Sequence, residues 1–298
     1  MTKNKTIGVV ILNYATFPET IALVEALQSQ STAQTLRIVI VDNASPNESY
    51  NQLKPLRERF ENVVAVLQTG KNLGYAKGNN FGLKHLEENN APDYVAILNN
   101  DVILPNDCFE RLIKRYEVLE NPAIIAPMMV DIDGNRQFMG NLGSTWQDFK
   151  ILFSLYTKLS KPTVSTEVDN TGQQAMRVDV IGGSFMFARF DTFKEMGYFY
   201  PNTFLYVEER FVAEAAKRLG YNNYVLLDQT YIHAHNSPTI SSYHGQISKY
   251  KMLYKSRLEY IKVCKKHGRI KAAIFKPFMQ WSLFEWRVIG WVKSKIGR

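Results

Sequence analysis

The stretch that most limits how this chain can fold is an apolar run at residues 94–98 that ends in Asn99, Asn100 and Asp101. A short, continuously apolar run predicts a strand buried on both faces, as strands in parallel sheets are. In open α/β sheets, ligands bind beyond the carboxyl ends of such strands. One carboxylate beside neutral oxygen donors suits a hard divalent cation that also contacts phosphates. The alternative is a plain polar turn before Pro105, and this stretch alone leaves both interpretations open.

The same pattern occurs earlier in the chain. Three further apolar runs, separated by helical patterns, cover residues 7–12, 36–41 and 63–67. This regular alternation predicts an α/β fold with a mostly parallel central sheet flanked by helices. Polar residues follow the first two runs, beginning with Asn13-Tyr14 and Asp42-Asn43. A carboxylate at the position of Asp42 can accept a hydrogen bond from a ribose or a base, although an Asx turn or a helix cap explains it equally well. No glycine-rich motif follows the first strand, so NAD binding is not expected.

Gly74, Gly78 and Gly82 recur at the spacing that places them on one helix face. Against alanine, three glycines destabilise a helix by about 2–3 kcal/mol, so a specific contact must compensate. Either close packing of this helix on the sheet or the close approach of a ligand would provide that contact.

The second half of the chain is less regular. Its pattern predicts a hairpin around Asp133-Gly134, an aperiodic acceptor-side loop at 147–171, an apolar strand at 178–188 interrupted by Gly182-Gly183-Ser184, a helix opening at Glu208-Glu209, and a strand at 224–235. Adjacent carboxylates in a first helical turn are favoured by the helix dipole, and they are also candidates for a general base. His233 near a strand end is either structural or a ligand.

Composition predicts an ordinary globular protein. Hydrophobic residues make up 45% of the 298 residues, which is ample for a core. Two cysteines, Cys108 and Cys264, suggest neither a disulfide framework nor a metal cluster, and a reducing cytosol is the expected compartment. We expect no signal peptide, and no run of 18 uncharged apolar residues predicts a transmembrane span.

Positive charge is concentrated at the C-terminal end. Residues 249–298 carry net +12 against +8 for the whole chain, so the first 248 residues carry net −4. We expect a basic amphipathic helix at 246–266 and a second helix after Pro277. In the neighbourhood of the second helix, a shared apolar face is formed by Ile274, Phe278, Trp281, Val288 and Val292. This pattern favours in-plane contact with an anionic membrane surface, with packing on the protein's own core or on a partner as the alternative. No base-reading motif accompanies the charge, so no nucleic-acid partner is expected.

Taken in order, the strand-end motifs resemble the pattern of glycosyltransferase family 2, particularly its bacterial rhamnosyltransferase-like members. The matching segments span roughly residues 6–240 and are Val9–Tyr14, Ile40–Ser45, Asn72–Asn79, Leu98–Asp101, Ile181–Ser184, Phe204–Glu209 and Tyr231–His233. Each segment is a weak signal, whereas the ordered set is specific. The resemblance implies a GT-A fold, a nucleoside-diphosphate sugar donor, a Mg²⁺ or Mn²⁺ cofactor and inverting transfer to an acceptor hydroxyl.

The resemblance also implies roles for individual residues. The nucleotide base of the donor would be recognised by Asp42, and the metal would be held by Asp101 and His233. Glu209 would be the catalytic base, with Glu208 as the alternative. The donor site would be lined by Asn13, Tyr14, Asn43, Asn72, Gly74, Asn79, Asn99 and Asn100, and Gly183 and Glu208 would lie on the acceptor side. This sequence departs from the family pattern in having Asn-Asn-Asp instead of Asp-x-Asp, and Glu instead of Asp at the base position.

We therefore predict a GT-A domain at 1–240, with a nucleotide-sugar half at 1–125 and an acceptor half at 126–240, followed by a basic helical extension at 241–298. The expected enzyme moves rhamnose from dTDP-rhamnose, or a hexose from a UDP-sugar, onto a lipid-linked saccharide in cell-surface polysaccharide synthesis. The expected location is the cytoplasmic face of the plasma membrane, and a homo-oligomer is left open. The alternatives are a non-catalytic sugar-nucleotide-binding or membrane-binding module and a nucleotidyltransferase.

Overall fold

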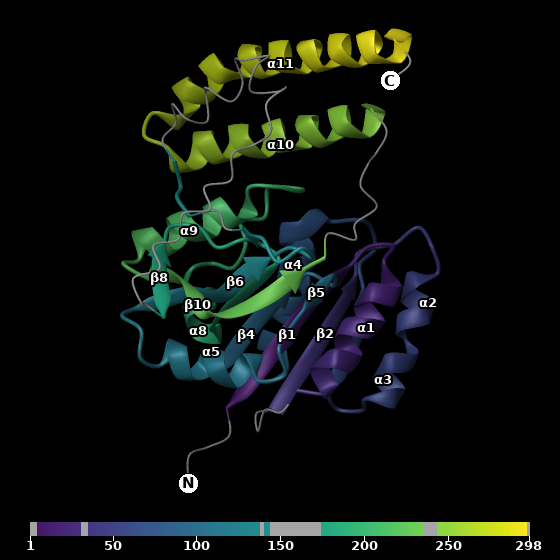
Figure 1. Ribbon diagram of the computed structural model, residues 1–298, viewed down its shortest axis with the longest axis vertical. Coiled ribbons are helices and arrows are strands. Elements are labelled where there is room, and N and C mark those ends of the chain that lie inside the picture. The colour runs from purple at the N-terminus through teal and green to yellow at the C-terminus, as the bar shows by residue number, and fades with distance from the viewer. Residues whose placement is uncertain (1–4, 31–34, 138–139, 144–173, 235–242, 297–298) are drawn as a thin grey trace.

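The computed structural model describes residues 5–30, 35–137, 140–143, 174–234 and 243–296. The first half of the chain forms the predicted alternation of strands and helices (Figure 1). Its strands are β1 (Thr6–Asn13), β2 (Thr35–Asp42), β3 (Val64–Gln68), β4 (Tyr94–Leu98) and β5 (Val102–Ile103). Its helices are α1 (Phe17–Gln28), α2 (Ser49–Leu53), α3 (Pro55–Arg59), α4 (Gly74–Glu88) and α5 (Cys108–Tyr116).

The second half adds strands to the same sheet and helices above it. Its strands are β6 (Pro122–Val130), β7 (Arg136–Gln137), β8 (Ala175–Val178), β9 (Phe185–Arg189) and β10 (Asn222–His233). Its helices are α8 (Phe190–Glu195), α9 (Glu208–Arg218), α10 (Tyr243–Cys264) and α11 (Gly268–Ile296). The hairpin predicted around Asp133-Gly134 is confirmed, because β6 and β7 pair antiparallel on either side of it.

The strands pair in the order β3-β2-β1-β4-β9-β6-β10-β5. The first four are parallel, as predicted, and β9 lies antiparallel between β4 and β6. The prediction of one strand at 178–188 is wrong. Its two ends belong to β8 and β9, which pair with β10 and β4 respectively, and Gly182-Gly183-Ser184 lies in the connection between them.

Alternation along the strands divides the core between the two faces of the sheet. Ile7, Val9 and Ile11 of β1 pack in a buried cluster with α1, α2, α3 and α5. Val10 of the same strand packs in a second cluster with α4, α8 and α9. The strands are therefore covered on both sides, which leaves their polar carboxyl ends as the open edge of this part of the fold.

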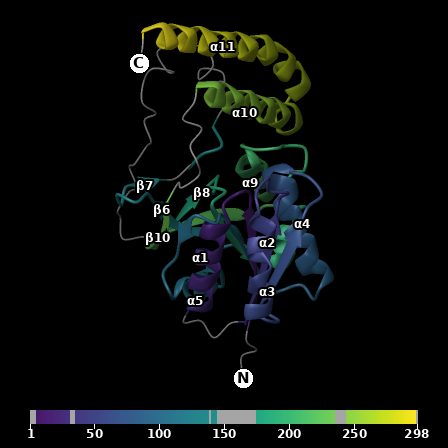
Figure 2. The same cartoon turned by 90° about the vertical axis from the view of Figure 1, so that its right-hand side faces the viewer.

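Helices α10 and α11 form a further layer beyond the strand ends, stacked on α9 (Figures 1 and 2). Val207, Phe211, Tyr260, Phe275 and Met279 belong to the buried cluster that joins these three helices. The extension thus shares a core with the α9 region, and the predicted boundary near residue 240 falls outside the described residues.

The prediction that the last helix starts after Pro277 is wrong, because α11 begins at Gly268 and continues through this proline. A proline inside a helix destabilises it by about 3 kcal/mol. Phe275 and Met279 are buried on either side of Pro277, so packing on α10 extends across the break and opposes that loss. Among the described residues, no helix is both long enough and apolar enough to cross a bilayer. The aperiodic loop predicted at 147–171, and His235 at the end of the predicted last strand, lie outside the described residues.

Candidate active site

The polar ends of β1, β2 and β4 meet in one buried hydrogen-bond network. Parallel pairing sets Asn13 beside Asp42. The Asn13 amide donates to Asp42 Oδ1 over 2.8 Å, and Asn13 Oδ1 accepts from the Thr20 hydroxyl over 2.9 Å. The Asn100 amide in turn donates to Thr20 Oγ1 over 2.9 Å. Residues from three strand ends are therefore brought together as predicted, and they are held by bonds to the protein itself.

Asp42 is fully buried, and both of its carboxylate oxygens accept hydrogen bonds. Besides Asn13, its donors are the Ser45 amide at 3.2 Å, the Ser45 hydroxyl at 2.5 Å and the Gln68 side chain at 3.4 Å. A charge satisfied in this way organises the strand ends. Recognition of a base by Asp42 stays a prediction, since it would require a ligand to replace one of these donors.

Asn43 holds the turn that precedes α4. Its amide donates to Asn72 Oδ1 and to the Gly74 carbonyl, and its Oδ1 accepts from the Leu73 amide over 2.9 Å. Asn79 is fully buried inside α4 and donates to the Tyr75 carbonyl.

The predicted donor-site residues therefore separate into two groups. Asn13, Asp42, Asn43 and Asn79 are interior supports with almost no accessible surface. The residues that keep accessible surface, where a sugar nucleotide could reach them, are Tyr14, Asn72, Asn99, Asn100 and Asp101.

The glycine face of α4 is explained by packing, with one special position. A Cβ on Gly78 would lie 2.5 Å from Leu12, and one on Gly82 would lie 2.7 Å from Val10, so these glycines let the helix sit against β1. Gly74 has a left-handed φ of +79°, and a Cβ there would lie 2.2 Å from the Phe204 carbonyl oxygen. Gly74 therefore lets the start of α4 touch the loop that leads into α9.

Asp101 and His233 form the candidate metal site. The antiparallel pairing of β5 with β10 places His233 opposite Val102, and His233 Nε2 lies 3.1 Å from Asp101 Oδ1. The Asn99 amide nitrogen is 3.4 Å from the same ring nitrogen.

This donor set fits a divalent cation whose remaining positions are filled by phosphate oxygens and water. No group of three or more His, Cys, Asp or Glu side chains suited to a metal occurs among the described residues. The metal role of Asp101 and His233 stays a prediction.

A pair of carboxylates at the start of α9 forms the second centre. Burial, and to a lesser degree the charge of Glu209, raises the pKa of Glu208 to about 7. Glu208 is 4% exposed, and its Oε1 has no hydrogen-bond partner within the described part of the chain. Burial also raises the pKa of Glu209, and the positive charges of Arg210 and Arg257 oppose this effect. Glu208 therefore exchanges protons more readily near neutral pH than an exposed glutamate does.

The backbone leading into this pair is strained. Tyr206 and Val207 have successive left-handed φ values of +72° and +74°, which for a β-branched residue such as Val207 is a true outlier. The Tyr75 amide donates to the Phe204 carbonyl over 2.8 Å, and the Ser256 hydroxyl of α10 donates to the Leu205 carbonyl over 2.8 Å. Helices α4 and α10 thus hold the loop from both sides, and strain maintained in this way is typical of functional sites.

The Gly183-Ser184 segment connects the two centres. Its Gly183 carbonyl accepts a hydrogen bond from the Tyr75 hydroxyl, and its Ser184 carbonyl accepts one from the backbone N–H of Asn99 over 2.9 Å. The Ser184 and Tyr231 hydroxyls are 2.7 Å apart.

Charge effects join the same groups. Burial and the charges of Glu208 and Glu209 raise the pKa of Tyr75, whereas burial and, to a smaller extent, Asp101 raise that of Tyr231. Tyr75 and Tyr231, which both contact this segment, therefore experience the charges of the carboxylate pair and of Asp101 respectively.

Tyr75, Ser184 and Tyr231 were absent from the predicted site. Tyr75 lies within the motif at 72–79, and Tyr231 shares a strand face with His233, so each was near a recognised signal. Their hydrogen bonds join β9, β10 and α4, and no local pattern contains that information.

The comparisons with known proteins agree with this arrangement. The profile described as Glycosyl transferase family 2 matches residues 7–182, which is more than half of the chain. No curated protein sequence matches at a significant level.

Among solved structures, a mannosyltransferase from Pyrobaculum calidifontis in complex with GDP-Man and Mn²⁺ superposes with a TM-score of 0.58 at 14% identity, covering 100% of this chain and 77% of the other. TarS residues 1–349 from S. aureus with UDP-GlcNAc gives 0.55 at 16% identity, covering 92% and 71%. GalNAc-T7 with UDP, GalNAc and Mn²⁺ gives 0.60 at 12% identity, covering 99% of this chain and 58% of the other.

These likenesses establish the GT-A fold, and the profile match supplies the family. The predicted fold and the predicted family are thereby confirmed, and the rhamnosyltransferase-like subtype stays a prediction. The chain belongs to glycosyl transferase family 2.

Proposed function

We propose that the protein is an inverting, metal-dependent glycosyltransferase that moves one sugar from a nucleoside diphosphate to an acceptor hydroxyl. The observation that carries this proposal is that neighbours of both centres, Tyr75 and Asn99, bond to the Gly183-Ser184 segment. One centre offers Asp101 and His233 for a metal-bound diphosphate, and the other offers the buried carboxylate of Glu208 and the half-buried carboxylate of Glu209 for a proton.

In the proposed reaction, Glu209 accepts the proton of the acceptor hydroxyl. The acceptor oxygen then bonds to the anomeric carbon while the bond from that carbon to the phosphate oxygen breaks, and the electron pair leaves with the nucleoside diphosphate. A Mg²⁺ or Mn²⁺ ion held by Asp101 and His233 would neutralise the negative charge of this leaving group. Asn99, 3.4 Å from His233, helps to orient the imidazole ring.

We assign the base role to Glu209 and keep Glu208 as the alternative. Arg257 and Arg210 both favour the ionised form of Glu209, which is the form that a base needs. Glu208, with its pKa raised to about 7, is partly protonated at neutral pH. In that state it can donate a hydrogen bond to the acceptor, on the side that Gly183 lines.

For the donor we propose dTDP-rhamnose, with a UDP-hexose as second choice. Support for rhamnose comes only from the likeness of the strand-end motifs to rhamnosyltransferases. The related structures contain GDP-Man and UDP-GlcNAc, so the fold itself accepts more than one nucleotide and sugar. For the acceptor we propose a lipid-linked saccharide used in bacterial cell-surface polysaccharide synthesis, on the cytoplasmic face of the plasma membrane.

The test is a panel of sugar nucleotides incubated with the protein, an acceptor extract and either Mn²⁺ or Mg²⁺, with release of nucleoside diphosphate as readout. Glu209→Gln and Glu208→Gln are compared with wild type, and Asp101→Asn tests the metal site. We expect Glu209→Gln to lower kcat by roughly 10²–10⁴-fold, the range for a lost general base. Full turnover in both glutamine variants would remove the assignment of the base.

A non-catalytic sugar-nucleotide-binding module is the second candidate, suggested by Asn99 in place of an acidic residue and Glu209 in place of an aspartate. Calorimetry distinguishes the two candidates. Donor binding that Mn²⁺ does not strengthen, together with no hydrolysis or transfer, would favour the binding module. A nucleotidyltransferase is disfavoured, because residues 13–16 lack the glycine-rich basic loop that such enzymes place after the first strand.

A further inference from the structure

Helix α11 carries an exposed apolar stripe along its outer side. Ile270, Ile274, Trp281, Val288 and Val292 are each between 38% and 63% exposed. At about 100° per residue, these five side chains fall within an arc of roughly 40°. Large apolar groups aligned in this way over six turns differ from the scattered exposed side chains of an ordinary surface.

The opposite face of α11 already provides its contacts with the protein. Phe275, Met279 and Ser282 are buried there, and the Ser282 hydroxyl is 2.8 Å from that of Tyr254 in α10. Trp286 stacks on Tyr250 with ring centroids 4.6 Å apart. The sequence left open whether this helix packs on the protein's own core or on a membrane, and the structure assigns the core contact to a face other than the stripe.

Positive charge borders the stripe. Arg269, Lys276 and Arg287 are exposed along one flank of α11, and Lys295 is exposed at its C-terminal end. Glu285 is the only carboxylate in the helix, and it accepts a hydrogen bond from the Trp281 indole over 2.8 Å. An apolar surface bordered by cations, with its one carboxylate hydrogen-bonded, complements anionic headgroups above an acyl layer.

We propose that α11 lies in the plane of an anionic lipid bilayer, with the stripe in the boundary between headgroups and acyl chains. Trp281 provides an aromatic ring with a polar N–H, which suits that depth, and the lysine and arginine side chains extend to the phosphates. A second copy of the chain is a poorer occupant. Two stripes meeting about a two-fold axis would bring two C-terminal segments of net +12 into contact.

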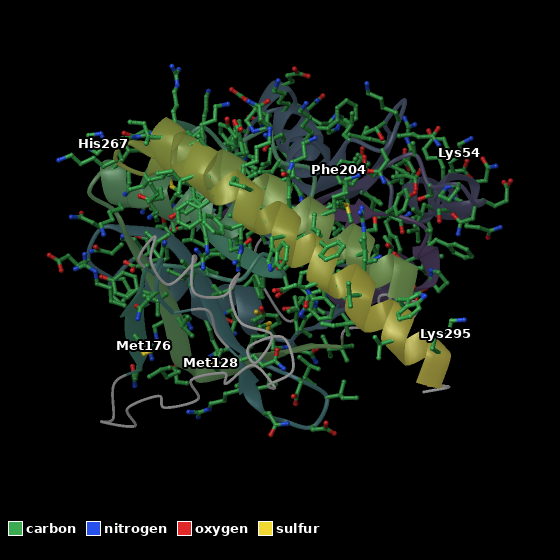
Figure 3. The ribbon with its side chains drawn as sticks, turned by 90° about the horizontal axis from the view of Figure 1, so that it is seen from above. Lys54, Met128, Met176, Phe204, His267 and Lys295 are labelled. Carbon is green, nitrogen blue, oxygen red and sulfur yellow. The ribbon has the colours of Figure 1, made fainter. Side chains whose placement is uncertain are left out.

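The position of the stripe also suggests how the enzyme would reach its acceptor, an inference that rests on the proposed function. In Figure 1, α10 and α11 lie above the end of the sheet toward which β1, β2 and β4 run. Figure 3 shows α11 lying across the top of the molecule, from the turn at His267 to Lys295. Through the Ser256 hydroxyl, α10 touches the loop that leads to Glu208. The bilayer would therefore lie on the side of the catalytic carboxylates, where an acceptor with a lipid anchor is held.

The experiment is flotation of the full-length chain with phosphatidylcholine vesicles that contain or lack about one third phosphatidylglycerol. The variant Ile274→Glu/Val288→Glu places charges in the stripe. The control Val118→Glu places a charge on an exposed apolar side chain in the turn after α5, outside α10 and α11. We expect wild type and the control to float with anionic vesicles, and the stripe variant to partition on the order of 100-fold less, from two lost apolar insertions.

Sedimentation velocity without lipid, and circular dichroism of each variant, accompany the flotation. Failure of wild type to bind anionic vesicles, or equal binding by the stripe variant, would overturn the proposal. So would a wild-type dimer that dissociates in the stripe variant and never binds vesicles, because the stripe would then be a protein interface. Since flotation needs no sugar transfer, a failure of the membrane proposal is distinguishable from a failure of the proposed activity.

Discussion

Two buried carboxylates, Asp42 at the end of β2 and Glu208 at the start of α9, are surrounded by the protein in opposite ways. Asp42 accepts hydrogen bonds from Asn13, Ser45 and Gln68 through both of its oxygens. Glu208 has a buried oxygen without a partner among the described residues, and its pKa is raised to about 7. Asp42 therefore contributes to a fixed framework, whereas Glu208 is held in a state that favours proton uptake.

This difference indicates that the two halves of the fold differ in rigidity and in local strain. Hydrogen bonds among strand ends fix the half proposed to bind the donor, residues 1–125, before any ligand arrives, which would lower the entropic cost of binding. In the half proposed to bind the acceptor, residues 126–240, the Glu208 carboxylate is poorly solvated and follows a strained loop, which destabilises the fold locally and is typical of functional sites. Substitutions at the two carboxylates should consequently change stability in opposite directions.

The largest effect on stability is expected from Asp42→Ala. The substitution leaves several buried donors without an acceptor, and each such donor costs about 1–3 kcal/mol. We expect the free energy of unfolding to fall by roughly 3–5 kcal/mol in urea titrations. Asp42→Asn, which keeps one acceptor oxygen, should lose less. A loss below about 1 kcal/mol for Asp42→Ala would show that the network is not a framework.

Glu208→Gln is expected to act in the other direction. Because the folded-state pKa of Glu208 is raised from 4.5 to about 7, the folded protein binds more protons than the unfolded chain between these values. Stability due to this group is therefore fully present below pH 4.5, falls as pH rises toward 7 and stays low above it. Removing the charge should stabilise the protein above pH 7 by up to roughly 3 kcal/mol.

The measurement is urea unfolding of wild type and Glu208→Gln at several pH values between 5 and 8. The difference between the two proteins should grow with pH and then level off. A difference independent of pH would show that Glu208 is ionised throughout this range and would end the contrast with Asp42.

The donor half was largely predictable from the sequence, because its signals are local. Apolar runs ending in polar residues predicted β1, β2 and β4, and parallel pairing then brings Asn13 beside Asp42 without further information. The resemblance to a known family supplied the partners Asp101 and His233, and the structure places them 3.1 Å apart.

The acceptor half was less predictable, because its features depend on contacts between distant segments. Strand β9 lies between β4 and β6 and runs antiparallel to both, and no periodicity in the sequence encodes this position or direction. The helix through Pro277 persists because Phe275 and Met279 are packed on α10. The raised pKa of Glu208 arises mainly from burial, which depends on the packing of the folded chain.

Gly74→Ala should have a smaller effect on stability, because it disturbs the contact between α4 and the loop that leads into α9. An added Cβ would lie 2.2 Å from the Phe204 carbonyl oxygen, so the loop carrying Glu208 must move. The matched control is Gly220→Ala, which has the same φ of +79° and open space around it. Both should lose about 1–2 kcal/mol from left-handed strain. Only Gly74→Ala should lose a further 1–3 kcal/mol and also lower kcat. Equal losses in both variants would mean that the contact with Phe204 has no role.

The smallest expected effect concerns the link between α10 and the loop that leads into α9. Ser256→Ala removes the hydrogen bond to the Leu205 carbonyl, and Ser282→Ala removes one buried hydrogen bond between α10 and α11. Each should lower the free energy of unfolding by about 1 kcal/mol. Steady-state kinetics should separate them, because only the Leu205 bond supports the strained turn before Glu208, so kcat should fall in Ser256→Ala alone. If kcat falls equally in both variants, α10 supports the site through its packing as a whole. The difference between a rigid donor half and a strained acceptor half would then include both C-terminal helices.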